Sequence, residues 1–208
     1  MKTVIKSIFL LIINFSCFSQ NTGKEKLNLV FYDVCTNKII KPEFEIDSFP
    51  ELNYKTVTIF PKRGDLIGQY STIIKTNSDT IRIPKILFSF KSVLHSRKWN
   101  YLNCEKVCDG TETDFYSNGN KRLVGEFKNG RPIKINEFRK NGKLLTQTFY
   151  ENYTLNYVRV NYFDESGELN EYEIYKNKKR KTIIRTFDKN GNLINKETKK
   201  KYIKRKNN

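Results

Sequence analysis

Four glycines recur through the C-terminal half of the chain at nearly constant spacing, and this repeat constrains the fold more than any other feature. Gly119, Gly142, Gly167 and Gly191 are separated by 23, 25 and 24 residues. Self-similarity at a fixed period of this length is typical of repeat architectures, in which each unit buries its apolar side only against its neighbours. We therefore expect an array of about four repeats.

Apolar residues keep fixed offsets from these glycines. A phenylalanine stands four residues before each glycine, a leucine stands two residues after the last three, and an aromatic residue stands eight residues after the first three. In that order these residues are Phe115, Phe138, Phe163 and Phe187; Leu144, Leu169 and Leu193; and Phe127, Tyr150 and Tyr175.

The segment around Gly191 has the composition of a β-hairpin turn. Asp188 suits the first position of a type I turn, and Gly191 suits the left-handed position of a three-residue loop. This geometry places Phe187 opposite Leu193, and the same register predicts the pairs Phe138–Leu144 and Phe163–Leu169. Because alternate residues of a strand share one face, the Phe, the Leu and the later aromatic residue are predicted to lie on a single side of each hairpin.

The first repeat also resembles a known family. The segments Asp114 to Lys121 and Gly125 to Pro132 are similar to the bacterial MORN-repeat variant, in which a Tyr-Tyr-x-Asn-Gly-Lys turn is followed by Gly-x-Phe/Tyr-Lys-Asn-Gly-Lys-Pro. The resemblance covers residues 109–199, but the later repeats lose the second Asn-Gly. It implies a twisted antiparallel array used for protein or membrane-surface contacts, and some members are known as antitoxin- or immunity-like partners.

The region from 20 to 103 contains short strand-like runs, such as Leu29 to Tyr32, Thr56 to Phe60 and Tyr70 to Ile74, separated by turn residues. Asp33 to Pro42 and the later Gly68-Gln69-Tyr70 resemble carboxypeptidase-regulatory, transthyretin-like β-sandwich domains. That likeness implies a rigid spacer or carbohydrate-facing module without catalytic residues.

The fold class expected for the whole chain is therefore all-β. A small N-terminal β-sandwich-like domain (20–103) precedes a single-layer antiparallel array of about four β-hairpins (104–198), and a basic tail (199–208) follows. The aromatic content of 13% is enough to order such a thin structure even though hydrophobic residues make up only 38% of the chain.

The first 19 residues are expected to be a signal peptide. Lys2 and Lys6 precede an apolar run that is too short to span a bilayer, and Cys17 and Ser19 occupy the small-residue positions before a cleavage site. We expect cleavage near Ser19 and export, to the periplasm, to the outer membrane or to the medium. A lipid-anchored Cys17 is the alternative, although Asn14 stands where a lipobox has an aliphatic residue.

The cysteines leave several arrangements open. In an exported chain Cys35, Cys104 and Cys108 are candidates for one disulfide, either Cys104–Cys108 or Cys35–Cys104, with free buried thiols as the third possibility. Zinc bound by these three residues and His95 is a further alternative, but the Cys-x-x-x-Cys spacing is looser than that of zinc knuckles. We predict no metal, no cofactor and no catalytic residues.

These features favour a non-enzymatic protein-interaction scaffold or binding module. Its exposed aromatic residues are the candidate contact surface, namely Tyr116, Tyr150, Tyr153, Tyr157, Tyr162 and Tyr172. The net charge of +17 is densest in the tail, so an anionic membrane surface is an alternative partner; an antitoxin- or immunity-like role is another. Neither nucleic acid nor a small-molecule substrate is expected to bind.

Overall fold

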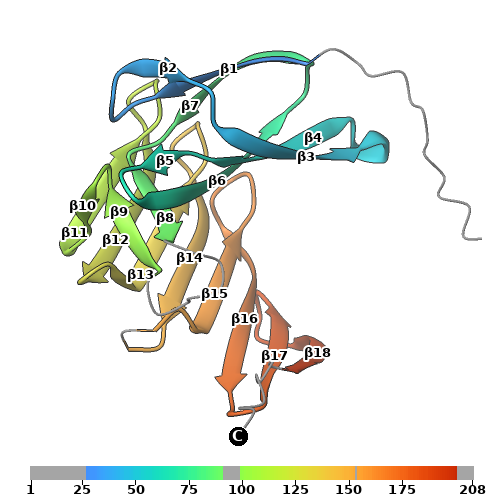
Figure 1. Ribbon diagram of the computed structural model, residues 1–208. Helices are drawn as coiled ribbons and strands as arrows, with labels where there is room; N and C mark the ends of the chain where they lie inside the picture. The colour runs from blue at the N-terminus through green and yellow to red at the C-terminus, as the bar shows by residue number, and fades with distance from the viewer. Residues whose placement is uncertain (1–26, 91–98, 153, 201–208) are drawn as a thin grey trace, which may run out of the picture.

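A computed structural model describes residues 27–90, 99–152 and 154–200, and it is almost entirely β-structure (Figure 1). A short 3-10 turn, η1 (Pro50–Leu52), is the helical element among these residues. The predicted all-β fold is confirmed. The predicted signal peptide, His95, Tyr153 and positions 201–208 of the basic tail lie outside the described residues. Within the described ranges, no helix has the length and hydropathy needed to cross a bilayer.

The N-terminal region forms two sheets that share a core. In the first sheet the order is β2-β1-β7, with β1 antiparallel to β2 and parallel to β7. In the second it is β10-β9-β8-β6-β4-β3, with β5 paired to β6. The strands are β1 (Asn28–Asp33), β2 (Lys38–Ile40), β3 (Glu43–Phe49), β4 (Tyr54–Phe60), β5 (Lys62–Arg63), β6 (Leu66–Ile74), β7 (Ser78–Ile83), β8 (Ile86–Phe90), β9 (Asn100–Asn103) and β10 (Lys106–Val107).

Side chains from both sheets meet in one apolar cluster, which makes this region sandwich-like as expected. Phe31 and Ile83 come from the smaller sheet, and Val57, Ile59 and Leu87 come from the larger one; all five are buried.

A buried ion pair adds a polar tie inside this N-terminal region. Arg63 Nη2 lies 2.7 Å from Asp33 Oδ1 and also donates to the Pro84 carbonyl oxygen. Breaking such a pair by removing one partner is costly because it leaves an uncompensated buried charge.

The C-terminal half is a single eight-stranded antiparallel sheet in which every strand pairs with its neighbour in sequence. In Figure 1 it extends from beneath the N-terminal sheets down to the C-terminus. Its strands are β11 (Gly110–Phe115), β12 (Lys121–Lys128), β13 (Arg131–Phe138), β14 (Leu144–Tyr150), β15 (Tyr157–Phe163), β16 (Leu169–Asn177), β17 (Lys181–Asp188) and β18 (Leu193–Lys200). These are four hairpins, the number expected, and β9–β10, which spans residue 104, belongs to the N-terminal sheet.

The predicted hairpin turns are confirmed. The four repeat glycines all have a left-handed backbone, with φ between +83° at Gly119 and +89° at Gly191. In the last turn the Gly191 N–H donates to the Asp188 carbonyl oxygen and the Asp188 N–H donates to the Asn192 carbonyl oxygen. The predicted cross-strand pairs Phe138–Leu144, Phe163–Leu169 and Phe187–Leu193 are present.

The prediction that the Phe, the Leu and the later aromatic residue share one side is wrong. Just after each turn the pairing register shifts by one residue, as in the step from Phe138–Leu144 to Glu137–Thr146. The extra residue of each β-bulge reverses the alternation of side chains along the outgoing strand. Phe138 therefore lies on one face of the array and Tyr150 lies on the other.

The two halves of the molecule meet in a second apolar cluster. It joins Ile86 of β8 and Cys108 to Leu123, Phe127 and Ile135 of the first two hairpins. Tyr101 of β9 packs on this cluster, with its ring 5.2 Å from that of Phe127. The array is thus attached to the N-terminal region through its first two hairpins.

Candidate functional site

The pairing register of β11–β18 sorts the side chains of the array onto two faces of opposite charge. Directly paired residues project to the same side, and successive residues alternate except at the bulges. One side, called the tyrosine face, carries Tyr150, Tyr157, Tyr162 and Tyr175 with Glu112, Asp114, Glu137, Glu171, Glu173, Asp188 and Glu197; the other, called the basic face, carries Lys121, Lys128, Arg131, Lys134, Arg159, Lys176, Lys181, Arg185, Lys196 and Lys200. The described exceptions are Lys199 and the bulge residue Arg122, which contacts Asp114, on the first face and Glu126 on the second.

A run of tyrosine rings crosses the tyrosine face. The Tyr150 and Tyr157 ring centroids are 5.4 Å apart at 70°, and those of Tyr157 and Tyr175 are 5.4 Å apart at 81°. Both are edge-to-face contacts, which aromatic pairs prefer. Val160 and Ile184 are buried beside the rings on the same face, while Tyr157 keeps 42% of its surface exposed. A rigid aromatic ridge is therefore open at its crest.

Carboxylates fix the hydroxyl ends of these rings. Tyr162 donates a 3.0 Å hydrogen bond to Glu173 Oε2, and Tyr175 donates to the same oxygen. Burial, together with this hydrogen bond, raises the pKa of Tyr162 to about 12. Burial also raises the pKa of Tyr150, which shares a hydrogen bond with Tyr101. These tyrosines stay protonated at neutral pH and act as hydrogen-bond donors rather than bases.

A close approach explains why the first repeat differs. Phe127 folds its ring over Gly125, where an added Cβ would lie 2.3 Å from the ring. In the second and third repeats the equivalent positions are Thr148 and Glu173, which leave no room for that arrangement. Tyr150 and Tyr175 instead contact Tyr157. The ridge therefore consists of the repeats that have a larger residue at the position of Gly125.

The basic face is a regular array of amides, rings and cations. Gln147 Nε2 donates to Asn136 Oδ1 and Asn161 Nδ2 donates to Gln147 Oε1, each at 3.0 Å, which forms a ladder across three strands. Arg159 donates from Nε to Asn161 Oδ1 at 2.6 Å, and its guanidinium lies 4.2 Å from the ring centroid of Tyr172. These contacts hold the guanidinium in one orientation.

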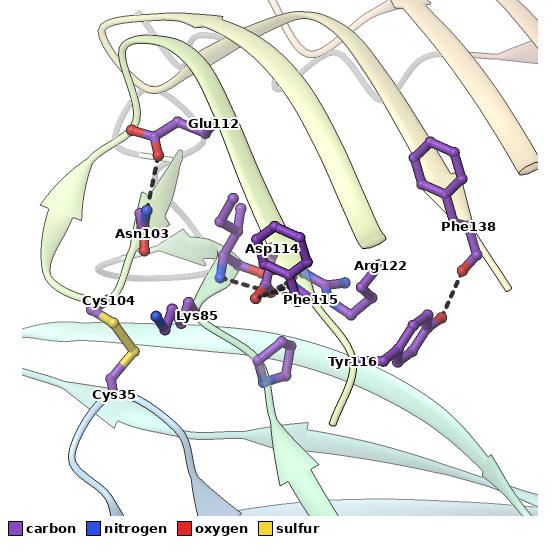
Figure 2. Close-up of polar contacts among 12 residues, drawn as sticks. Cys35, Lys85, Asn103, Cys104, Glu112, Asp114, Phe115, Tyr116, Arg122 and Phe138 are labelled. Atoms are coloured by element: carbon purple, nitrogen blue, oxygen red, sulfur yellow. Dashed lines mark hydrogen bonds and ion pairs between the residues drawn. A yellow bond between two sulfur atoms is a disulfide. The ribbon is translucent and has the colours of Figure 1, made fainter. Parts of the chain in front are cut away.

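The junction between the two halves is fixed by a polar network (Figure 2). Asp114 Oδ2 accepts hydrogen bonds from Arg122 Nη2 at 2.8 Å and from the Ile86 N–H at 3.2 Å, and Arg122 donates to the Ile86 carbonyl oxygen. Figure 2 also shows the Tyr116 hydroxyl donating to the Phe138 carbonyl oxygen at 2.7 Å. A cleft of about 400 Å³ lies beside this network, lined by Arg82, Lys140 and others. Tyr116 is therefore a junction residue.

The disulfide joins the two N-terminal sheets to each other beside this junction. Of the pairings left open by the sequence, the structure contains Cys35–Cys104, which links the turn after β1 to the turn after β9 (Figure 2). Cys108 is free and buried, and burial raises the pKa of its thiol to about 12. A thiol with such a pKa is protonated at neutral pH and is a poor nucleophile.

The disulfide also takes two of the four residues considered as zinc ligands. Cys35 and Cys104 no longer offer thiolates, and no group of three or more metal-ligating side chains occurs in the part of the chain that the structure describes.

The aromatic residues predicted as a contact surface are divided among three places. Tyr150, Tyr157 and Tyr162 lie on the tyrosine face, Tyr172 lies on the basic face, and Tyr116 lies at the junction. Neither the contacts of Glu173 with Tyr162 and Tyr175 nor the amide ladder was predicted from the sequence. If one extra residue is counted after each turn, the alternation along the strands places the acidic residues on one face and the basic residues on the other.

No protein-family model matches the chain, and no curated protein matches it.

Proposed function

We propose that this protein is a non-enzymatic binding module of an exported, MORN-like kind, and that its tyrosine face binds a protein partner. The observation that carries the proposal is the ridge of Tyr150, Tyr157 and Tyr175, which is held by edge-to-face ring contacts and exposed at Tyr157. Tyrosine is enriched at protein interfaces because its large ring contributes contact area at a small cost in side-chain entropy.

The charges around the ridge indicate the chemistry of the partner. Glu137, Glu171 and Glu173 lie on the same face as the rings, so the surface suits a partner segment with lysine or arginine side chains. A cation can contact both a ring face and a carboxylate in this setting.

The junction supports a presenting role for the N-terminal region. Asp114 and Arg122 hold the first hairpin on β8 and are engaged in structural hydrogen bonds. The disulfide, which is typical of chains that fold in oxidising compartments, supports the proposed export. Both features suit an N-terminal region that acts as a rigid support for the recognition surface.

Cross-linking from within the ridge tests the proposal. A photo-reactive phenylalanine analogue placed at Tyr157 of the full chain should cross-link to one protein from the native extracytoplasmic fraction, and Tyr175→Ala should reduce its recovery. The same analogue at Phe115, a similarly exposed ring on the other face, is the matched control. Equal cross-linking from both positions, or turnover of a substrate by the purified protein, would contradict the proposal.

A further inference from the structure

The basic face has features that the proposed protein partner does not use. We propose that it binds a linear acidic polysaccharide that carries one carboxylate or sulfate on every second sugar, lying across the strands from β13 to β18. This inference concerns the opposite side of the array and does not rest on the proposed function.

The face is free of covering structure among the described elements. The buried apolar side chains of the array, including Leu123, Ile135, Val160 and Ile184, lie on the tyrosine face, and the N-terminal sheet packs on that side. On the basic face Ile174 remains 40% exposed in the middle of the sheet.

The cations of this face form a row whose spacing suggests the ligand. Cross-strand pairing aligns Lys134, Phe149, Arg159, Ile174 and Arg185 on consecutive strands. Cations therefore alternate with apolar residues, and those on β13, β15 and β17 are separated by two strand spacings, about 9–10 Å. One sugar of an extended chain is about as long as one strand spacing, so every second sugar meets a cation.

Like charges face one another at the end of this row. Arg185 pairs directly with Lys196, and further along the same two strands Lys181 pairs directly with Lys200. Directly opposed like charges in a sheet destabilise it. An anionic ligand along the row would remove that repulsion, which gives the pairs a role in binding.

The neighbouring row supplies groups that suit sugar hydroxyls. Asn136, Gln147 and Asn161 lie on consecutive strands and are joined in one ladder. Each amide has two N–H donors and an oxygen with two lone pairs, so Asn136 and Gln147, both half-buried, keep capacity for hydrogen bonds to a ligand.

Single-stranded nucleic acid matches this face less well, because it carries a phosphate on every unit and gains affinity by stacking bases on open ring faces. Here Phe187 stacks on Tyr172 at 5.1 Å, Arg159 lies over the same ring, and Lys134 lies over Phe149. These ring faces are already occupied.

Titration of the full-length protein with a hyaluronan oligosaccharide, which has one carboxylate per disaccharide, tests the proposal. The wild-type protein should bind it in low salt and bind more weakly in high salt, since exposed charge pairs are screened. The double variant Lys134→Gln/Arg185→Gln should lower the affinity by about tenfold. The double variant Lys179→Gln/Lys189→Gln removes the same charge from exposed turns and should bind like the wild type.

Two further anionic ligands test whether the basic face recognises the polysaccharide or attracts any anion. Oligo-deoxythymidine and anionic phosphatidylserine vesicles should bind less tightly than the oligosaccharide. No binding of hyaluronan, an equal loss in the two double variants, or tighter binding of either other anion would overturn the proposal. Circular dichroism of each variant checks the fold, and Lys196→Gln on the exposed last strand gives a single-site variant if the first pair fails to fold.

Discussion

The first and the last repeats share a turn but differ in what surrounds them. In the first, Phe127 is 2% exposed and packs against Tyr101 of the N-terminal sheet. In the last, every residue of β18 is exposed. The same hairpin is therefore core at one end of the array and surface at the other, and the stability of the array comes mainly from the attached end.

The turns that connect one hairpin to the next, at the other edge of the array from the repeat glycines, differ for the same reason. The first repeat has Asn129-Gly130, whose backbone donates to the Cys108 carbonyl oxygen at 2.7 Å and accepts from the Tyr101 N–H at 2.8 Å. An added Cβ at Gly130 would lie 2.7 Å from Asn100 Cβ. The Asn-Gly sequence thus stands where the turn touches the N-terminal sheet.

Removing the ring at the attached end should have the largest effect on stability. Phe127→Ala should lower the free energy of unfolding by about 3–5 kcal/mol, because it leaves a cavity in the shared cluster. Phe187→Ala in the last repeat should cost only about 1–2 kcal/mol, since that ring is half-buried. Denaturant unfolding of both variants measures the difference, and equal losses would contradict a graded array.

Opening the disulfide should have the next largest effect. The Cys35→Ser/Cys104→Ser double variant should lose about 2–4 kcal/mol, because the bridge closes a long loop in the unfolded chain. Amide hydrogen exchange should accelerate in β11 and β12 more than in β17 and β18. Uniform acceleration along the array would show that the junction does not set local stability.

Substituting glycines at the two ends should separate strain from crowding. Gly130→Ala should cost about 2–3 kcal/mol, because a left-handed backbone and a close contact both oppose the added methyl group. Gly191→Ala has the same backbone but no atom closer than 3.7 Å, so it should cost about 1 kcal/mol. Thermal unfolding of the two variants compares them, and a smaller loss at Gly130 would refute the contact.

The smallest expected effect is a local response to acid at the free end. Hydrogen bonds from Asn192 lower the pKa of Asp188, and one from Ser166 lowers that of Asp164. A lowered pKa in the folded state stabilises these turns above the unfolded value of about 4, and the effect disappears as the pH falls through the folded pKa.

Nuclear magnetic resonance of the turn amides between about pH 5 and 2 measures this response. The Asn192 N–H, which donates to Asp188 Oδ1 at 2.8 Å, should lose its protection relative to the intrinsic exchange rate in acid. The turns of the first two repeats carry Tyr116 and Arg139 at the equivalent position and should not respond. Asp188→Ala should abolish the response in the last turn, and its persistence would assign the response to another group.

Local chemistry made the turns predictable from sequence. A glycine in a left-handed conformation and an aspartate at the first turn position act within a few residues, so the pairing of Phe187 with Leu193 followed directly. The faces of the array were not predictable in the same way, because the extra residue of each bulge (Arg122, Leu145, Asn170 and Ile194) has no common residue type. If one bulge residue is missed, every side chain after it in the strand is assigned to the wrong face.

Long-range features were the least predictable. The parallel pairing of β1 with β7 brings together segments that are far apart in sequence, and nothing in either run specifies its partner. The choice between two disulfides likewise depended on the packing that places Cys35 beside Cys104. The amide ladder combines residues from three strands of two hairpins, so only the sheet register reveals it.

Because the buried contacts between the N-terminal region and the sheet lie on β11–β14, the number of hairpins beyond β14 can vary without disturbing them. Deleting β17 and β18 would leave the disulfide, the Asp114–Arg122 pair and the Phe127 cluster untouched, and grafting another hairpin after Lys200 would lengthen the sheet without altering them. Descendants of such a chain can therefore change their reach in steps of one hairpin, while the N-terminal support stays the same.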